Sequence, residues 1–512
     1  MSRTNTHNRS EDLGFPLYMT FCAVLAAISG FNVGWHISVP NMPEGVISQC
    51  TDGNIPVGAL PACLPMDSYT WGYTVGAFAL GGLVGSLATM YLNVWLGRRD
   101  NIMIACGWMI LGGILSACAI NIGMYSIGRA FVGIASGMSG SSVAIYVSEI
   151  STTKSRGALG SLFELFLNLG ILLTQVCGLY MSYVPTWRLL WAIPTFIAAI
   201  QLGCLLLFTV ECPRRLCANQ QYDKARAALQ KLRAGADIDK EFDDLLKARQ
   251  REIDEGSRRM SVLDIILLKD KRITWNTIIV MVLQAYNQVG GIGPMSVYSV
   301  GFLTTVFNGQ KTLATNISLA NATGNIVATF ISVILMHKVG RKGFMIISLA
   351  GMTIASVFLV IGSASAAADQ LAGLVITAAI LFTFTYSMGC GVIPWLIAPE
   401  LLPLRALPPG SALGNASNWL FNFIINTIWP QMNNNLGDYS FCVFAAINFV
   451  GLLFVIFCMP ETTGKSLDDH SKKKKNKDLF TEEEHEEVSG TSVSSSSDDN
   501  KSHNIQYIET AH

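Results

Sequence analysis

Three ionisable side chains stand inside long apolar stretches of the sequence. Glu164 is the only acid that we place deep within such a stretch, and His36 and Arg129 lie within two others. Ionisable groups are costly in apolar segments, so they are usually retained for a function such as proton transfer. Glu164 is therefore a candidate proton carrier, and His36, which Arg129 would face, is a second candidate.

Uncharged amides form a second group of polar residues in apolar stretches. Gln284 and Gln288 are four residues apart, and Asn418 directly precedes Trp419. An amide both donates and accepts hydrogen bonds, and it is expensive to bury unless it is paired. We therefore interpret Gln288 and Asn418 as lining a pocket for an uncharged polar ligand rather than as packing residues.

Catalytic chemistry is not indicated elsewhere in the sequence. The polar loops contain no pair of nucleophile and base, no phosphate-binding loop and no metal-ligand cluster, so we expect neither an enzyme nor a cofactor or bound metal. Among the cysteines, Cys50 and Cys63 share a polar loop. If that loop faces an oxidising exterior, the two cysteines either form a disulfide or stay free, and the sequence leaves both readings open.

The elements that must position these residues are membrane-spanning helices. The chain has 512 residues, of which 51% are hydrophobic and 14% are charged, and this is too apolar for a soluble protein of its size. About twelve apolar stretches of roughly 20 residues account for nearly half of the chain. The composition thus predicts an all-α polytopic membrane protein and excludes a nucleic-acid-binding protein or a cytosolic hydrolase.

Apolar stretches and the charges between them predict the spans and their orientation. Basic residues of short loops, such as Arg98 and Arg341, all fall on one side, whereas loop 39–69 has acids and no basic residue. Basic loops face the cytoplasm, so we expect both termini to be cytoplasmic. The predicted spans are 16–38, 70–92, 101–120, 123–148, 158–181, 187–210, 273–304, 313–336, 343–365, 371–398, 407–432 and 439–459.

Changes in composition divide the chain into five parts. The insert between the sixth and seventh spans carries Ala225, Leu229 and Leu232 at helical spacing, which favours amphipathic cytoplasmic helices over a solvated linker. The last part is rich in charge and serine and is typical of disorder. The parts are a cytoplasmic N-terminus (1–15), a first six-helix half (16–210), the helical insert (211–272), a second six-helix half (273–464) and a disordered tail (465–512).

Three short patterns recur in the two halves. Their members follow in the same order at an offset of about 250 residues, which indicates an internal duplication. Two related six-helix halves with charges at their cytoplasmic ends are typical of a secondary transporter whose site lies between the halves. The corresponding patterns are Gly97-Arg98-Arg99 with Gly340-Arg341-Lys342, Glu149 and Arg156 with Glu400 and Arg405, and Glu211 with Glu461.

Taken together, these motifs resemble those of the major facilitator superfamily, and in detail its sugar porter branch, the facilitative glucose transporters. The resemblance covers about residues 15–466 and implies the major facilitator fold of twelve membrane helices in two six-helix halves with a cytoplasmic helical insert. The motifs that carry it are Gly128-Arg129, Glu149 to Gly157, Glu211-Cys212-Pro213-Arg214, Gln284 to Ser299, Ile393-Pro394-Trp395, Ser417-Asn418-Trp419 and Pro460-Glu461-Thr462.

By this resemblance, charged residues at the cytoplasmic ends of the helices form a gate. Its ion pairs would tie the two halves together when the substrate site faces outward, and they would break in the opposite state. The gate residues that the resemblance implies are Arg98, Glu149, Arg156, Arg341, Glu400 and Arg405, of which Arg405 is displaced by two positions from the family's pattern.

The resemblance also implies a pocket of amides and aromatic side chains, which suits the hydroxyls and apolar faces of a sugar. The implied substrate-binding residues are Glu164, Gln175, Gln284, Asn287, Gln288, Trp395, Asn418 and Trp419. Departures from the family's polar pattern occur at Glu164, Asn287, Gly293, Ala328 and Ser387. Each lost hydrogen bond to a hydroxyl costs about 1–3 kcal/mol, so these departures predict a changed substrate or a changed affinity.

The resulting hypothesis is a plasma-membrane uniporter that moves glucose or a related hexose or polyol by alternating access. Its expected partners are the sugar and the lipid bilayer, with no nucleic acid and no cofactor. Two alternatives remain open, namely a proton-coupled sugar symporter that uses Glu164 and a sensor that binds sugar without moving it. The oligomeric state has no signature in the sequence.

Overall fold

The computed structural model describes residues 14–51, 60–152, 154–234, 236–254, 264–265, 267, 269–364, 371–402 and 406–462. The predicted tail at 465–512, most of the N-terminal segment 1–15 and the predicted gate residue Arg405 lie outside these residues.

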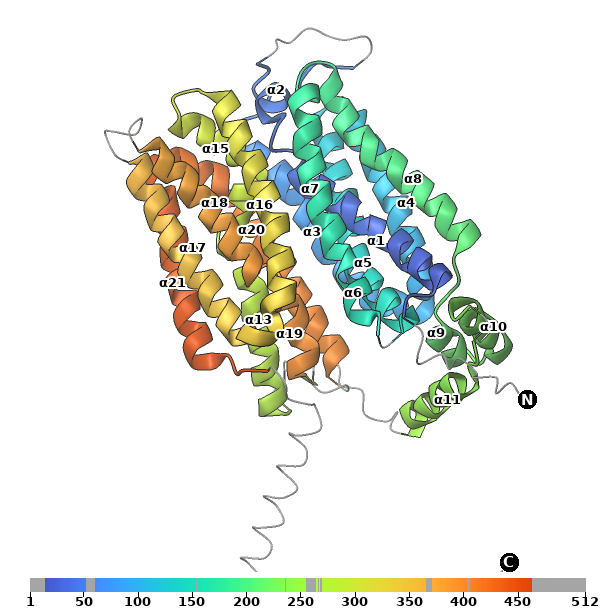
Figure 1. Ribbon diagram of the computed structural model, residues 1–512. Helices are drawn as coiled ribbons and strands as arrows, with labels where there is room; N and C mark the ends of the chain where they lie inside the picture. The colour runs from blue at the N-terminus through green and yellow to red at the C-terminus, as the bar shows by residue number, and fades with distance from the viewer. Residues whose placement is uncertain are drawn as a thin grey trace, which may run out of the picture. The chain divides into compact units, whose positions relative to one another are not determined.

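The first half of the chain forms six helical spans, coloured blue to green in Figure 1. Asp67 and Asn121 begin two of them, because their side-chain oxygens accept backbone N–H groups of the first helical turn. The spans are α1 (Leu17–Ser38), α3 (Ser68–Trp95), α4 (Arg98–Ala117), α5 (Ile122–Ile150), α6 (Arg156–Gly160) with α7 (Leu162–Met181), and α8 (Leu189–Phe208).

The second half repeats this plan with two broken spans, coloured yellow-green to red in Figure 1. The seventh span bends by 69° before α15, and the tenth is interrupted between Met388 and Ile393, where Gly389, Gly391 and Pro394 disfavour a continuous helix. The spans are α13 (Lys271–Val289) with α14 (Ile292–Val297) and α15 (Ser299–Val306), α16 (Lys311–Val339), α17 (Arg341–Ser363), α18 (Ala372–Met388) with α19 (Ile393–Leu401), α20 (Leu407–Leu436) and α21 (Ser440–Cys458).

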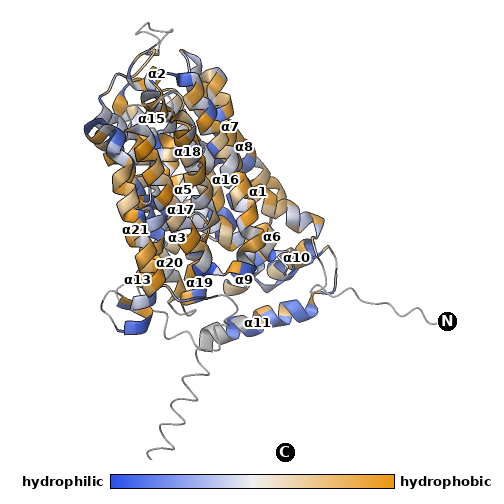
Figure 2. Ribbon diagram, turned by 60° about the vertical axis from the view of Figure 1, so that its left-hand side comes forward, coloured by the Kyte–Doolittle hydropathy of each residue, from blue (hydrophilic) through white to orange (hydrophobic). Residues whose placement is uncertain are grey.

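These spans are the membrane-crossing elements expected from the sequence. Nine segments of the described residues are long and apolar enough to cross a bilayer, and one of them, Pro409–Cys458, covers most of α20 and all of α21. The bent seventh span is a further segment of this kind. Helix α16, which carries Asn316, Asn321 and Asn325, completes the second half. Figure 2 shows apolar residues along the spans and polar residues on α11. The predicted all-α fold of two six-helix halves is confirmed.

Small residues allow the helices of the first half to pack closely. A Cβ atom on Gly81 of α3 would stand 1.9 Å from the Ala130 carbonyl oxygen of α5, and one on Gly133 of α5 would stand 1.9 Å from the Phe78 carbonyl oxygen. Close backbone approach at small residues is a main source of helix association in membranes. These helices therefore form a rigid frame for the side chains that they carry.

Three short helices follow the first half: α9 (Pro213–Ala218), α10 (Tyr222–Leu232) and α11 (Asp239–Asp254). Ala225, Leu229 and Leu232 of α10 are buried, as helical spacing requires for an amphipathic helix that packs on the protein. Arg233 is also buried and donates to the Ile150 carbonyl oxygen at the end of α5 at 2.8 Å. The described part of the insert is thus mostly helical and contacts the first half.

The two ends of the helix bundle differ in chemistry, and we name them by residues that they carry. The basic end carries Arg98 and Arg341 at the starts of α4 and α17. The disulfide end carries the disulfide between Cys50 and Cys63, next to the short helix α2 (Glu44–Ser48).

Candidate functional site

A network of amides joins α13 to α20. Residues 284, 287 and 288 share one face of α13, because they are separated by three and four positions. Asn418 Nδ2 donates to Gln284 Oε1 at 3.0 Å and to Asn287 Oδ1 at 2.9 Å, and Gln288 Nε2 donates to Asn418 Oδ1 at 3.2 Å. The structure thus brings four predicted substrate-binding residues together.

The amide network is anchored at the break between α18 and α19. Gln284 Nε2 donates to the Pro394 carbonyl oxygen at 3.0 Å, and Asn287 Nδ2 donates to the Cys390 carbonyl oxygen at 2.6 Å. Cys390 lies in the break between the two helices and Pro394 in the first turn of α19, so backbone carbonyls on both sides of the break hold the amides in place. Gln288 is only partly buried and so remains accessible to a ligand.

Sequence reasoning missed two further amides on α20. Asn422 Nδ2 donates to Gln288 Oε1 at 2.8 Å, and Asn426 Nδ2 donates to Asn422 Oδ1 at 2.9 Å. The signal was present, because Asn418, Asn422 and Asn426 recur every four residues and therefore share one face of α20. The network is longer than the family resemblance implied.

The eighth span keeps an amide near the position where the sequence indicated its loss. Ala328 is buried, but Asn325, one turn earlier on α16, accepts a hydrogen bond from Ser387 Oγ of α18 at 2.6 Å. Two of the expected departures, Ala328 and Ser387, therefore lie beside an intact polar contact that the sequence analysis did not identify.

Gln175 and Glu164 both lie on α7, and neither forms a hydrogen bond to the amides of α13 in the described residues. Gln175 Nε2 donates to Ser38 Oγ at 3.2 Å, and its Oε1 accepts from Ser318 Oγ of α16 at 3.0 Å, so Gln175 bridges the two halves. Glu164 is partly buried, accepts from Asn168 Nδ2 at 3.5 Å and lies close enough to Tyr386 of α18 for an electrostatic interaction.

The predicted pair of His36 and Arg129 meets through the backbone rather than through the imidazole ring. Arg129 is buried, and one guanidinium nitrogen donates to the His36 carbonyl oxygen at 2.8 Å. The guanidinium carbon also lies 4.8 Å from the ring centre of Phe78 and 5.3 Å from that of Trp191. Neither ring nitrogen of His36 has a hydrogen-bond partner among the described residues.

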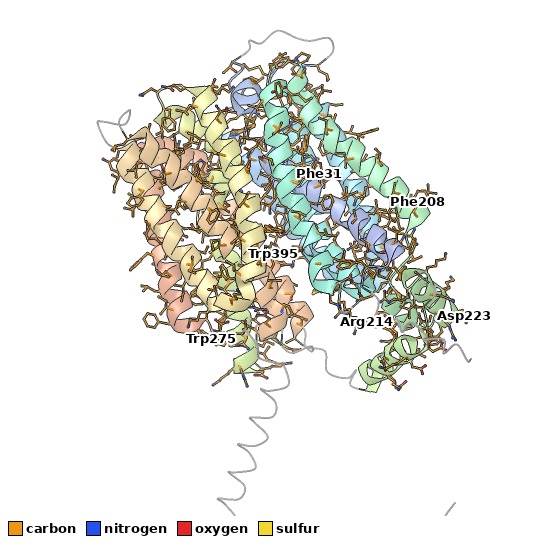
Figure 3. All side chains as sticks on the ribbon, viewed as in Figure 1. Phe31, Phe208, Arg214, Asp223, Trp275 and Trp395 are labelled. Atoms are coloured by element: carbon orange, nitrogen blue, oxygen red, sulfur yellow. A yellow bond between two sulfur atoms is a disulfide. The ribbon has the colours of Figure 1, made fainter. Side chains whose placement is uncertain are left out.

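The two predicted aromatic walls differ in their surroundings. Trp419 lies across the boundary between the halves, with its ring centre 5.7 Å from that of Phe78, and a Cβ atom on Gly82 would stand 2.3 Å from it. Trp395 is 42% exposed and follows directly after Pro394 on α19 (Figure 3). Trp419 is therefore held by packing between halves, whereas Trp395 has room to contact a ligand.

The disulfide end is closed by a buried polar cluster that joins the halves. Asn41, which lies between α1 and α2, donates from Nδ2 to Ser299 Oγ at 3.0 Å and to Ser318 Oγ at 3.1 Å. Its Oδ1 accepts from the Val300 backbone N–H at 3.0 Å. Asn41 is 1% exposed, so these bonds are shielded from water. Sequence reasoning gave Asn41 no role.

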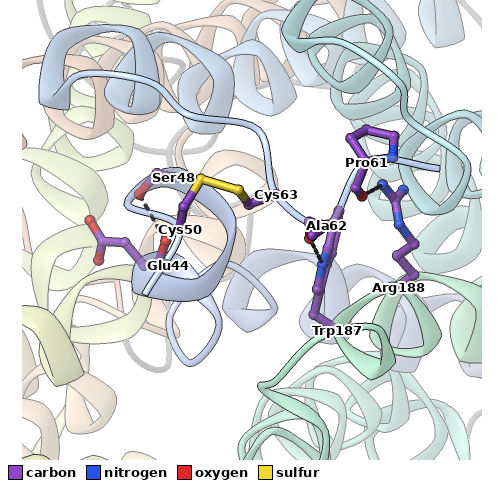
Figure 4. Close-up of a disulfide and its surroundings, with 8 residues drawn as sticks. All are labelled: Glu44, Ser48, Cys50, Pro61, Ala62, Cys63, Trp187 and Arg188. Carbon is purple, nitrogen blue, oxygen red and sulfur yellow. Dashed lines mark hydrogen bonds between the residues drawn. A yellow bond between two sulfur atoms is a disulfide. The ribbon is translucent and has the colours of Figure 1, made fainter. Parts of the chain in front are cut away.

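A carboxyl group lies beside this cluster. A Cβ atom on Gly301 of α15 would stand 3.0 Å from Glu44 Oε2, and burial raises the pKa of the Glu44 carboxyl to about 7. Figure 4 shows Glu44 near the disulfide of Cys50 and Cys63, which the sequence left open. Just before Cys63 the loop is fixed to the short helical turn Thr186–Arg188 that precedes α8, because Trp187 Nε1 donates to the Ala62 carbonyl oxygen at 2.9 Å.

At the basic end, the described residues include an ion pair in each half. Arg98 lies 3.1 Å from Glu149, and Arg341 lies 2.9 Å from Glu400. Arg156 is exposed and has no ion-pair partner in the described part of the chain. The observed pairs each lie within one half, so the implied role of these charges in joining the halves stays a prediction.

The repeated acids Glu211 and Glu461 hold equivalent helix starts. Glu211 Oε1 accepts from the backbone N–H groups of Arg98 and Arg99, and Glu461 accepts from those of Arg341 and Lys342. Gly97 and Gly340 precede these helices at φ values of 112° and 83°, and a Cβ atom on either would stand within 3.0 Å of the acid. Burial raises the pKa of the Glu211 carboxyl, although the backbone N–H of Cys212 opposes the rise.

Comparisons with known proteins agree with this architecture. Residues 22–473 match the family model described as sugar (and other) transporter. The chain is 30% identical to the solute carrier family 2, facilitated glucose transporter member 3 of Oryctolagus cuniculus, over 88% of this chain and 91% of the relative. It is 31% identical to member 4 of Homo sapiens, over 88% of this chain and 89% of the relative.

Solved structures share the fold at lower identity. A partially occluded inward open conformation of the xylose transporter XylE from E. coli covers 87% of this chain and 100% of its own, with a TM-score of 0.70 at 20% identity. The proton:xylose symporter XylE bound to 6-bromo-6-deoxy-D-glucose gives a TM-score of 0.67 at 19% identity, over 88% of this chain and 98% of its own. With the repeated helix starts and the matched family model, these findings confirm that the chain belongs to the sugar (and other) transporter family, the sugar porters of the major facilitator superfamily, and is a transporter rather than an enzyme.

Proposed function

We propose that the protein is a uniporter that carries glucose or a related hexose or polyol down its gradient across the plasma membrane. The observation that carries this proposal is the network of neutral amides on α13 and α20, anchored at the break between α18 and α19. Amides donate and accept at once, as a ring of hydroxyls requires, and they add no charge to repel a neutral ligand.

The two ends of the bundle support alternating access with a defined orientation. The disulfide is stable outside the cell, and the basic residues favour the cytoplasm, so the disulfide end would face outward and both termini would be cytoplasmic. Closure at the disulfide end by Asn41 then corresponds to one state of the cycle, and the charges at the basic end would join the halves in the other state.

The surroundings of Arg129 favour uniport over symport at that position. Its guanidinium donates to the His36 carbonyl oxygen and lies against two aromatic faces, and none of its contacts in the described residues is a carboxylate that would carry a proton. Proton-coupled symport is the second candidate function, because Glu164 is an ionisable group within a membrane span and its hydrogen-bond partner is the neutral amide of Asn168.

Uptake of labelled D-glucose into proteoliposomes, with and without an inward proton gradient, tests the proposal. A uniporter brings the internal concentration to the external one in both cases, and Glu164→Gln leaves this endpoint unchanged. Accumulation above the external concentration only with the gradient, abolished by Glu164→Gln, would establish symport instead. Binding without entry would contradict both mechanisms and leave the sensor.

A further inference from the structure

Asn426 presents a buried carbonyl oxygen that has no partner. Its Nδ2 donates to the backbone oxygen of Asn422 at 3.0 Å and to Asn422 Oδ1 at 2.9 Å. Both partners are acceptors, so the nitrogen of the Asn426 amide must face them, and the orientation of the amide is fixed. Oδ1 therefore faces the other way, and it has no hydrogen-bond partner among the described residues.

The direction in which this oxygen points is known from Gly293 of α14. A Cβ atom on Gly293 would stand 2.8 Å from Asn426 Oδ1, so the oxygen lies over the side of α14 from which a side chain would project. Tyr298 OH donates to the Asn426 backbone oxygen at 2.9 Å and holds this part of α20 against the seventh span. Positions 426 and 293 thus face each other, and the amide of Asn426 fits there because Gly293 has no side chain.

The unpaired oxygen continues the proposed substrate site. Asn426 is joined through Asn422 to Gln288, which we place among the substrate-binding residues. A buried acceptor without a donor costs about 1–3 kcal/mol, and the cost is recovered when a ligand supplies an O–H group. A Cβ atom at position 293 would stand 2.8 Å from Oδ1 and 3.6 Å from Nδ2 of Asn426, so a side chain there would crowd this amide.

We propose that Asn426 Oδ1 accepts a hydrogen bond from one hydroxyl of the transported polyol, an inference that rests on the proposed function. The hydroxyl-binding position next to the seventh span would then be supplied by α20, and Gly293 would be required to leave room for it. The substrate class is accordingly a polyol that donates a hydroxyl at this point.

Binding of D-glucose and of each of its monodeoxy analogues to purified protein, measured by calorimetry, tests the assignment. In the unmodified protein, one analogue should bind about 5- to 150-fold more weakly than glucose, which corresponds to the loss of one buried hydrogen bond. Asn426→Ala should weaken the binding of glucose by a similar factor, and it should not further weaken the binding of that analogue. Asn434→Ala, which changes an exposed asparagine on the same helix, should leave the order of affinities unchanged.

A reciprocal exchange provides a second test. Gly293→Asn alone should abolish binding, because its side chain would meet Asn426 Oδ1 at 2.8 Å. Combined with Asn426→Gly, it should restore binding, because the amide then projects from α14 into the vacated space. Thermal unfolding of each variant distinguishes lost binding from lost folding.

The outcomes separate this assignment from the proposed function. Suppose that the unmodified protein binds glucose and that Asn426→Ala has the same ratio of glucose affinity to analogue affinity for every analogue. The assignment is then wrong and the proposed function stands. If the unmodified protein binds and transports no hexose or other polyol, the proposed function fails and the assignment fails with it.

Discussion

Replacing Asn41 with alanine should shift the protein away from the conformation described here, because Asn41 closes the disulfide end. The substitution removes three buried hydrogen bonds between the halves, to Ser299, Ser318 and the Val300 N–H. At about 0.5–1.5 kcal/mol each, these three bonds favour the closed end by about 1.5–4.5 kcal/mol. The equilibrium between closed and open forms should therefore change by about 10- to 1,600-fold.

Hydrogen exchange of α15 in lipid nanodiscs measures this shift, since opening exposes the segment that Asn41 holds. Asn434→Ala is the matched control, because Asn434 also joins the halves, through Ser68 Oγ at 2.9 Å, but the contact is exposed and water replaces it. Exchange in Asn41→Ala should be far faster than in the control. Equal exchange in the two variants would show that the buried cluster does not hold the end closed.

Three further predictions follow from contacts described above. Below about pH 4.5 Glu44 is protonated in both the folded and the unfolded protein. Because the pKa of Glu44 in the folded protein is about 7, the stability of the protein should fall as pH rises from 4.5 toward 7. The unfolding temperature of Glu44→Gln should not show this dependence on pH. Glu211→Ala should lower the stability of the protein by about 0.5–2 kcal/mol through loss of the cap on α4, and Glu461→Ala should cost a similar amount in the other half; unequal shifts in unfolding temperature would argue against equivalent roles. Gln288→Leu should abolish glucose uptake at unchanged surface expression, since it removes both groups that pair with Asn418 and Asn422, and normal uptake would contradict the assigned site.

The sequence predicted the spans well, because apolar length is a local property of the chain. It also assigned Gln284, Gln288 and Asn418 to one pocket by a family motif, and in the structure these amides lie within hydrogen-bond distance of one another. Boundaries were less accurate at the broken spans, where Gly290 to Pro294 and Gly389 to Pro394 replace one helix by shorter ones.

Contacts between distant helices were beyond the reach of sequence patterns. Gln175 was expected with the other amides, but the approach of α7 to α16 places it at the disulfide end against Ser318. Arg129 was expected to face His36, and it does so through a carbonyl oxygen, which no side-chain pattern encodes. Asn41 was overlooked because its partners lie more than 250 positions away in the chain.

Glu211 and Glu461, the acids that hold the starts of α4 and α17, also bear on the evolutionary origin of the two halves. The same device, a glutamate after the sixth helix of a half that holds the start of its third helix, is present in both copies of the duplication. Two copies share such a detail most simply when it existed before the gene was doubled. The glutamate cap then dates from the single half, so each half inherited its own means of holding its third helix to its sixth.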